Sequence, residues 1–131
     1  MTDAELLDRF ERLDLDQFRH VDHLRVAWAY LERDDEGPAL AALVRGLTAL
    51  AGAKGHPEKF HYTMTRGWLE LIAAARRRHP DARSAADLLA RVPGLTDPRY
   101  LRRFYSDAVL DNDVARLGWV PPDRWPFDAT L

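Results

Sequence analysis

The most regular amphipathic segment of this 131-residue chain is Phe18-Arg19-His20-Val21-Asp22-His23-Leu24-Arg25-Val26-Ala27-Trp28-Ala29-Tyr30-Leu31. On an α-helix, side chains three and four positions apart lie on the same face. The face centred on His20 carries, on or beside its centre line, His23, Leu24, Ala27, Trp28, Tyr30 and Leu31. The two histidines therefore continue the apolar face of the predicted helix and do not belong to its polar side.

A second segment with a histidine on its apolar side is Glu58-Lys59-Phe60-His61-Tyr62-Thr63-Met64-Thr65-Arg66-Gly67-Trp68. Pro57 suits the first position of a helix, and an acidic residue is favourable in the first turn. On a helix that opens there, Thr65 and Trp68 align with His61, and Glu58 projects to the same side one turn earlier. We expect this helix to pack against the first one.

Three further features predict helices in the first part of the chain. Thr2-Asp3-Ala4-Glu5 has the pattern of a capping box, before a helix that we expect to end near Leu15. Pro38 suits the first position of a helix, and the apolar stripe after it predicts a helix that ends at Lys54-Gly55. The stripe consists of Leu40, Leu43, Val44, Leu47, Leu50 and Ala51. Gly46 within this stripe either costs stability or permits the close approach of a neighbouring helix.

The last third of the chain is more broken. Short helical segments are expected after Ser84, Asp97 and Asp113, with these three residues as their N-caps and Pro98 in the first turn of the second segment. The tail at 118–127 contains several prolines and cannot be regular helix. Its tryptophans and its phenylalanine indicate that the tail packs across the helical bundle.

These patterns predict one all-α domain over residues 1–131, a bundle of four to six helices with an irregular C-terminal tail. No segment shows the alternation of a strand. A length of 131 residues suits one compact domain, and a hydrophobic content of 47% is enough for a core.

Composition narrows the classes of function. The chain has no cysteine, which excludes disulfides, thiolate metal sites and cysteine nucleophiles. A formal net charge of −2 gives no long-range attraction to nucleic acid or to an anionic membrane. No apolar run approaches the length that spans a bilayer, and the acidic N-terminus lacks the apolar core of a signal peptide. We therefore expect a cytoplasmic protein that binds neither nucleic acid nor membrane.

The chain resembles a group of small uncharacterised bacterial proteins in scattered blocks. The shared pattern is Phe-x-His-x-x-His-Leu-Arg-x-Ala-Trp-x-Tyr-Leu, followed by an aromatic-His-x-Thr-x-Thr segment. Its residues in this chain are Phe18, His20, His23, Leu24, Arg25, Ala27, Trp28, Tyr30, Leu31, Phe60, His61, Thr63 and Thr65. Further matches are Tyr105, Ser106, Ala115, Arg116, Pro122 and Asp123. The resemblance implies a helical fold and the same histidines, and it implies no activity. Members of the group carry a glutamate where this chain has Tyr62, so no role of that carboxylate carries over.

The histidines are the candidates for chemistry. His20 and His23 lie three positions apart, so both rings can reach one point beside their helix. If the two histidine-bearing helices pack together, His61 offers a third nitrogen and Glu58 an oxygen. Such a mononuclear site would suit zinc, or ferrous iron if Glu58 joins. A di-iron site is rejected, because the chain has only one Glu-x-x-His motif of this kind.

Two other interpretations of the histidines stay open, and the sequence does not say whether the protein is an enzyme. The histidines could line a metal-free pocket for a small molecule or for acid–base chemistry, with Thr65 beside them and Trp28, Tyr30 and Trp68 as walls. They could instead form a purely structural hydrogen-bond network. In that case the protein would be a helical interaction module, for which a homodimer is one option.

Overall fold

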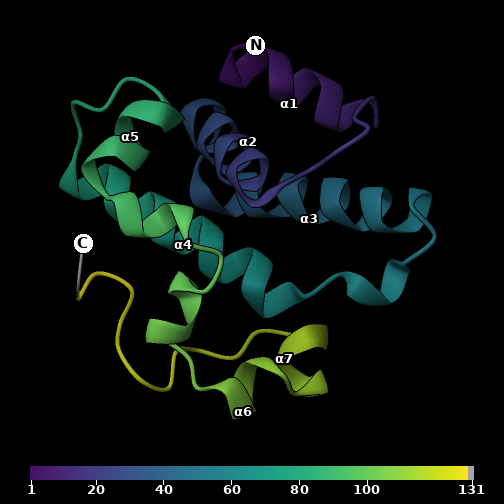
Figure 1. Cartoon of the computed structure of the whole chain (residues 1–131), viewed down its shortest axis with the longest axis vertical. Helices are drawn as coiled ribbons and strands as arrows, with labels where there is room; N and C mark the ends of the chain where they lie inside the picture. The colour runs from purple at the N-terminus through teal and green to yellow at the C-terminus, as the bar shows by residue number, and fades with distance from the viewer. Residues whose placement is uncertain (130–131) are drawn as a thin grey trace.

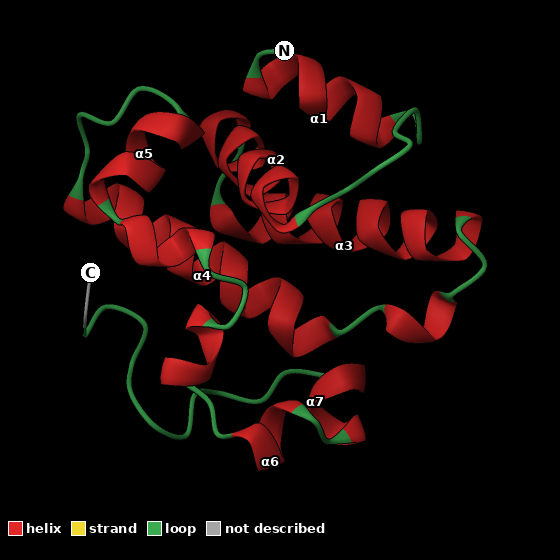
Figure 2. Cartoon of the chain, in the orientation of Figure 1, coloured by secondary structure: helices red, strands yellow, loops and turns green. Residues whose placement is uncertain are grey.

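The computed structural model of the protein describes residues 1–129. Within this range the chain forms α-helices and short 3-10 helices, and no strand (Figure 2). The α-helices are α1 (Asp3–Glu11), α2 (His20–Arg33), α3 (Glu36–Ala53), α4 (Tyr62–Arg78), α5 (Ala85–Arg91), α6 (Asp107–Leu110) and α7 (Asp113–Leu117). The 3-10 helices are η1 (Pro57–Lys59), η2 (Pro93–Thr96) and η3 (Tyr100–Arg103). The prediction of an all-α fold is confirmed for the described residues. Their seven α-helices, of which α6 and α7 have only four and five residues, roughly fit the expected bundle of four to six helices.

The helix α2 lies at the centre of the fold and contacts α1, α3, α4 and α5. Figure 1 shows it nearly along its axis, while α3 runs across the view beneath it. Its buried residues are Leu24, Val26, Ala27, Trp28, Ala29 and Tyr30. Val26 and Ala29 lie outside the predicted apolar face, whereas three members of that face, His20, His23 and Leu31, are only partly buried. Because α2 has neighbours on several sides, more of its surface is buried than a single stripe would give.

The first helix starts as predicted but ends earlier. Thr2 caps α1, and the reciprocal hydrogen bonds of a capping box join Thr2 and Glu5. The helix ends at Glu11, and Leu13 then adopts a positive φ of 56°. A non-glycine residue in this left-handed region stops the helix before the expected Leu15.

The long helix α3 makes a close contact with α1 through Gly46. A side chain at Gly46 would overlap the ring of Phe10, which is fully buried. Of the two roles that the sequence allowed for Gly46, the structure therefore supports close approach of a neighbouring helix. The helix begins at Glu36, so Pro38 lies in its first turn but not at its first position.

The short helices after α4 follow the predicted caps only in part. Ser84 caps α5 as expected. The segment after Asp97-Pro98 forms a 3-10 helix, η3, in place of an α-helix, and α7 is capped by Asn112 and not by Asp113. The four-residue helix α6, capped by Ser106, is absent from the prediction.

The C-terminal tail is held against α4 and η3, as its aromatic residues indicated. The hydroxyl of the buried Thr63 donates to the Gly118 carbonyl at 2.6 Å and accepts from the Val120 amide at 3.0 Å. Phe127 packs against the rings of Phe104 and Trp119.

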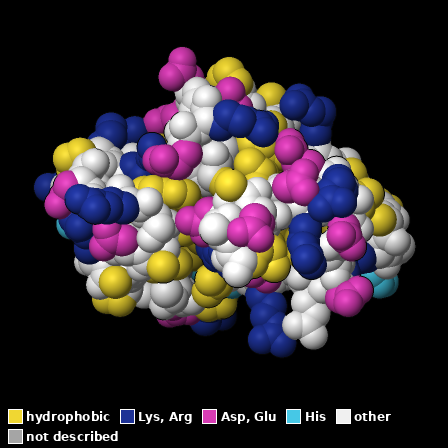
Figure 3. Space-filling model, turned by 90° about the horizontal axis from the view of Figure 1, so that it is seen from above, with side chains coloured by type: hydrophobic (Ala, Val, Ile, Leu, Met, Phe, Trp, Pro, Cys, Tyr) yellow, Lys and Arg dark blue, Asp and Glu magenta, His cyan; other side chains and the backbone are white. Residues whose placement is uncertain are grey.

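The surface carries charges of both signs. Figure 3 shows acidic and basic side chains interspersed with hydrophobic ones over the face that it presents. Among the helices of residues 1–129, none combines the length and the apolar character needed to cross a membrane.

Candidate functional site

A cavity of about 420 Å³ lies where α2, α3, η1 and the start of α4 meet. Three of its lining residues were predicted pocket members and lie on α4 or at its N-cap: His61, Thr65 and Trp68. A fourth predicted member, His23, comes from α2. The remaining lining residues are Phe18, Leu47, Leu50, Ala51, Lys54, His56, Lys59, Phe60 and Met64. We call this space the His23 cavity.

The position of His61 differs from the prediction. Instead of lying inside a helix that opens at Pro57, His61 is the N-cap of α4, which begins at Tyr62. The preceding η1 is a separate 3-10 turn, and Phe60 between the two is extended. The expected helical alignment of Glu58 with His61 is therefore wrong, because the chain changes direction between them.

Both ring nitrogens of His61 are engaged in hydrogen bonds. Nδ1 accepts from the Met64 amide at 3.0 Å, and Nε2 donates to the Leu110 carbonyl at 2.8 Å. A carbonyl can only accept and an amide N–H can only donate, so His61 is the neutral Nε2–H tautomer. The ring thus caps α4 and ties it to α6, and neither nitrogen has a lone pair left for a metal.

Thr65 and Trp68 are buried members of the cavity lining. Trp68 is buried, and the buried hydroxyl of Thr65 donates to the His61 carbonyl at 2.8 Å. This bond occupies the hydroxyl proton and leaves an oxygen lone pair as acceptor. Thr65 can therefore accept one hydrogen bond from a group inside the cavity.

His23 differs from the other two predicted histidines because its nitrogens find no partner within residues 1–129. Its Nε2 is buried and makes no hydrogen bond. Desolvation, with a smaller contribution from the nearby His20, lowers the pKa of His23 to about 4. The ring is therefore neutral at pH 7. An unpaired buried nitrogen costs about 1–3 kcal/mol, which a suitably placed partner would recover.

His20 does not line the His23 cavity. Its ring packs edge-on against Trp68, with the ring centroids 4.5 Å apart, and its Nε2 donates to the Leu95 carbonyl at 2.8 Å. This bond joins α2 to η2. The structure therefore gives His20 a packing role and separates it from the cavity that His23 and His61 share.

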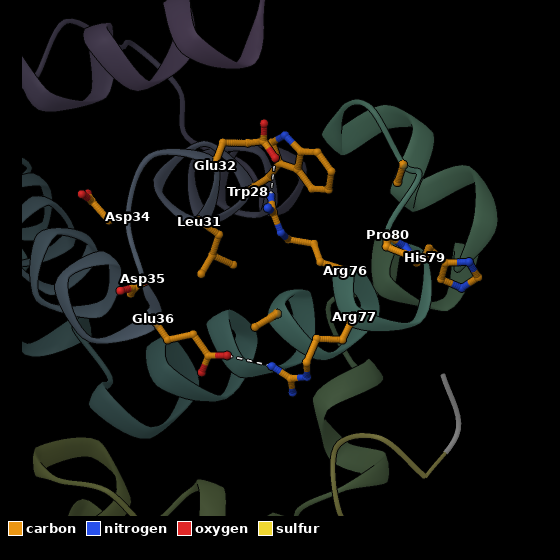
Figure 4. Close-up of a pocket in the computed structure, with 12 residues that line it drawn as sticks. Trp28, Leu31, Glu32, Asp34, Asp35, Glu36, Arg76, Arg77, His79 and Pro80 are labelled. Atoms are coloured by element: carbon orange, nitrogen blue, oxygen red, sulfur yellow. Dashed lines mark hydrogen bonds and ion pairs between the residues drawn. The ribbon is translucent and has the colours of Figure 1, made fainter.

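Tyr30 and Trp28 also lie outside the His23 cavity. The hydroxyl of the buried Tyr30 donates to the Glu11 carboxylate at 3.0 Å, and burial raises the pKa of Tyr30. Trp28 lines a second cavity of about 430 Å³, between the α2–α3 junction and the end of α4 (Figure 4). Trp28 and Tyr30, which were predicted as walls of the histidine pocket, therefore contact other parts of the fold.

Two ion pairs span the second cavity, which we call the Trp28 cavity. Arg76 pairs with Glu32 at 2.8 Å and lies over the Trp28 ring, 4.5 Å from its centroid. Arg77 pairs with Glu36 at 2.8 Å. Figure 4 marks this pair with a dashed line. The same lining includes Asp34 and Asp35. A ligand here would have to compete with these internal pairs.

The residues proposed for a metal do not converge. Glu58 is exposed, and its carboxylate contacts His56 at 3.3 Å. Within the described residues 1–129, no three histidine, aspartate or glutamate side chains are placed to hold one ion. The hypothesis of zinc or ferrous iron on His20, His23, His61 and Glu58 gains no support from this arrangement and stays a prediction.

Sequence reasoning missed the outer half of the His23 cavity. Lys54, His56 and Lys59 are exposed and line its mouth, while Leu47, Leu50 and Ala51 form the wall on α3. The apolar stripe of α3 contained the wall residues, but nothing in a helical pattern says which part of a stripe faces a cavity. Phe18 is another lining residue that was not predicted as a pocket member. It lies before the start of α2 and stacks on Phe10, with the ring centroids 5.1 Å apart.

The chain matches no protein-family model, and no curated protein or solved structure compared with it gives a match. The resemblance to a group of small bacterial proteins therefore stays a prediction. Function must be argued from the site.

Proposed function

We propose that this protein binds a small organic molecule in the His23 cavity. The observation that carries the proposal is the combination of a preformed, largely apolar cavity with a buried histidine nitrogen that has no partner. A volume of about 420 Å³ falls within the usual range of ligand pockets, about 300–1,000 Å³. Such pockets are mostly apolar, with a few polar groups that orient the ligand.

The His23 cavity is a better candidate than the Trp28 cavity. Its walls are side chains that need no ionic partner, among them Phe18, Leu50 and Met64. An apolar ligand would displace only water from them, which is favourable. In the Trp28 cavity a ligand would have to break the Arg76–Glu32 pair or leave it desolvated, and both are costly.

The neutral imidazole of His23 would orient the ligand. In either tautomer one ring nitrogen donates and the other accepts, so His23 suits a hydroxyl, carbonyl or amide group. Thr65 adds one acceptor. Rotation of the His23 ring toward the cavity is required for Nε2 to meet a ligand, because this atom is inaccessible in the unliganded structure.

Filling the cavity tests the proposal. Ala51 lines the cavity on α3 and forms none of the hydrogen bonds described above, so Ala51→Phe should occupy the space with little other change. A fragment library is screened by ligand-observed NMR against both proteins. We expect a set of fragments that bind the wild type and lose at least about tenfold in affinity in Ala51→Phe, which corresponds to about 1.4 kcal/mol.

The matched control is Ala53→Phe, two residues further on α3. Ala53 is exposed and is not part of the cavity lining. This variant should bind the same fragments as the wild type. Fragments that bind all three proteins equally, or a library in which nothing binds the wild type, would remove the basis of the proposal.

The rival function is a helical interaction module. One observation favours it: Val114 and Leu117 are 68% and 72% exposed and lie three residues apart on α7. However, α7 has only five residues, and a stable interface buries about 800 Å² on each partner. A monomer by light scattering at micromolar concentration would argue against the homodimer that the sequence left open.

A further inference from the structure

We infer that the ligand of the His23 cavity is an amphipathic anion, whose single acidic group lies at the mouth near Lys54 and Lys59 and whose apolar body fills the interior. The inference rests on the proposed function, because it names the ligand class of the same cavity. It follows from the charges of the mouth and from the separation of polar and apolar residues along the cavity.

The mouth is positively charged. Lys54 and Lys59 both line it, and no carboxylate from residues 1–129 is part of the lining. The carboxylate of Glu58 contacts the lining residue His56, and the pKa of Glu58 is lowered chiefly by a backbone hydrogen bond. Among the side chains that line the mouth and the one carboxylate that contacts them, two ammonium groups against one carboxylate give a net charge of about +1 at pH 7.

Neither lysine is neutralised by an ion pair with a described residue. Lys54 donates to a backbone carbonyl, that of Asp16, at 3.2 Å. Lys59 is exposed. An ammonium without a carboxylate partner can bind an incoming anion without first losing one. The Trp28 cavity differs in this respect, since four carboxylates and two arginines line it. The same holds for a cavity between α1 and α2, whose charged lining residues are Asp3, Asp8, Glu11, Glu32, Arg33 and Arg83.

The interior is apolar and carries no charge at pH 7. The side chains of Leu50, Met64 and Trp68 line it, and His23 is neutral there. A charged group would lose its hydration on entering this region, whereas a ring or a short alkyl chain would gain by leaving water. The ligand is thus expected to enter with its apolar end first and to leave its acid at the lysines.

Acid and amide pairs with the same body test the charge directly. Calorimetric titration compares 4-phenylbutyrate with 4-phenylbutanamide, and likewise the indolyl and cyclohexyl analogues of both. Each compound is added to the wild type, to the double variant Lys54→Gln/Lys59→Gln and to Glu58→Gln. We expect at least one acid to bind more tightly than its amide. In the double variant the acid should lose about threefold to tenfold and the amide should not change, because exposed charges contribute modestly. In Glu58→Gln the acid should bind more tightly. Added salt should weaken only the acid.

The outcomes separate this inference from the proposed function. If acids and amides bind equally, and both are blocked by Ala51→Phe but not by the lysine substitutions, the cavity is a ligand site and the anion inference is wrong. If neither acids nor amides bind at concentrations up to about 10 mM while other neutral fragments do, the inference is again overturned and the function stands. If no compound of any kind binds, both are wrong.

Discussion

His23 is the residue that most clearly links the fold to a ligand, and its burial has a consequence for stability. The unfolded chain takes up a proton on this imidazole near its ordinary pKa of about 6.5, whereas the folded protein does so only near 4. Between these values the unfolded state binds more protons, so acid favours unfolding. The stability contributed by neutral His23 is present above about pH 6.5 and is lost as the pH falls toward 4.

The prediction at this scale concerns His23→Phe, which keeps a ring and removes the titration. The free energy of unfolding of the wild type should fall more steeply than that of the variant between about pH 7 and 4, by up to about 3 kcal/mol. The full amount is an upper limit, because His23 as a whole residue is only partly buried. Urea unfolding at several pH values gives the difference. Parallel pH profiles for the two proteins would show that His23 is not desolvated.

The packing of α1 against α3 shows how a single position can fix the approach of two helices. Alanine is favoured over glycine inside a helix by about 1 kcal/mol, so Gly46→Ala would stabilise α3 in isolation. In the protein the added methyl group would overlap the ring of Phe10, which is fully buried. We expect Gly46→Ala to lower the free energy of unfolding by about 1–3 kcal/mol.

Gly52→Ala is the matched control on the same helix. A side chain at Gly52 would meet nothing within 4 Å, so this variant should be as stable as the wild type or more stable. Thermal unfolding of both variants decides the matter. An unchanged or higher midpoint for Gly46→Ala would mean that α1 can move away from α3 without cost.

Comparison of α2 with α4 shows what could be predicted at the level of helices. The apolar face of α2 followed from its periodicity, because fourteen helical residues repeat the pattern several times. The start of α4 could not be predicted in this way, because a histidine can either cap a helix or lie within it. Only the hydrogen bond from the Met64 amide to His61 shows that His61 is a cap. The four residues of α6 are too few for any periodicity.

At the level of the whole molecule, the C-terminal tail packs against α4 and is held there by hydrogen bonds to Thr63. Thr63→Val keeps the shape of the side chain but removes both hydrogen bonds that hold the tail, to Gly118 and Val120. We expect a loss of about 1–3 kcal/mol in the free energy of unfolding, together with faster hydrogen exchange of the Val120 amide. Thr48→Val, at an exposed site on α3, should change neither.

The sequence predicted the kind of candidate site, a histidine-lined pocket, but it did not predict all of the residues that line the cavity. Periodicity placed His23 on an apolar face and named His61, Thr65 and Trp68, all of which line the cavity. It could not tell that His20, Trp28 and Tyr30 turn to other neighbours, because that depends on which helices lie on each side of α2. The lysines of the mouth come from the end of α3 and from η1, and only the tertiary fold brings them together.

The location of a bound molecule tests the central claim most directly. Amide chemical shifts of labelled protein are followed while a fragment that binds the wild type is added. The account predicts shifts confined to residues around His23, Leu47–Lys54 and His61–Trp68, and their loss in Ala51→Phe. Shifts centred on the Trp28 cavity or on α7, or shifts that persist in Ala51→Phe, would contradict it.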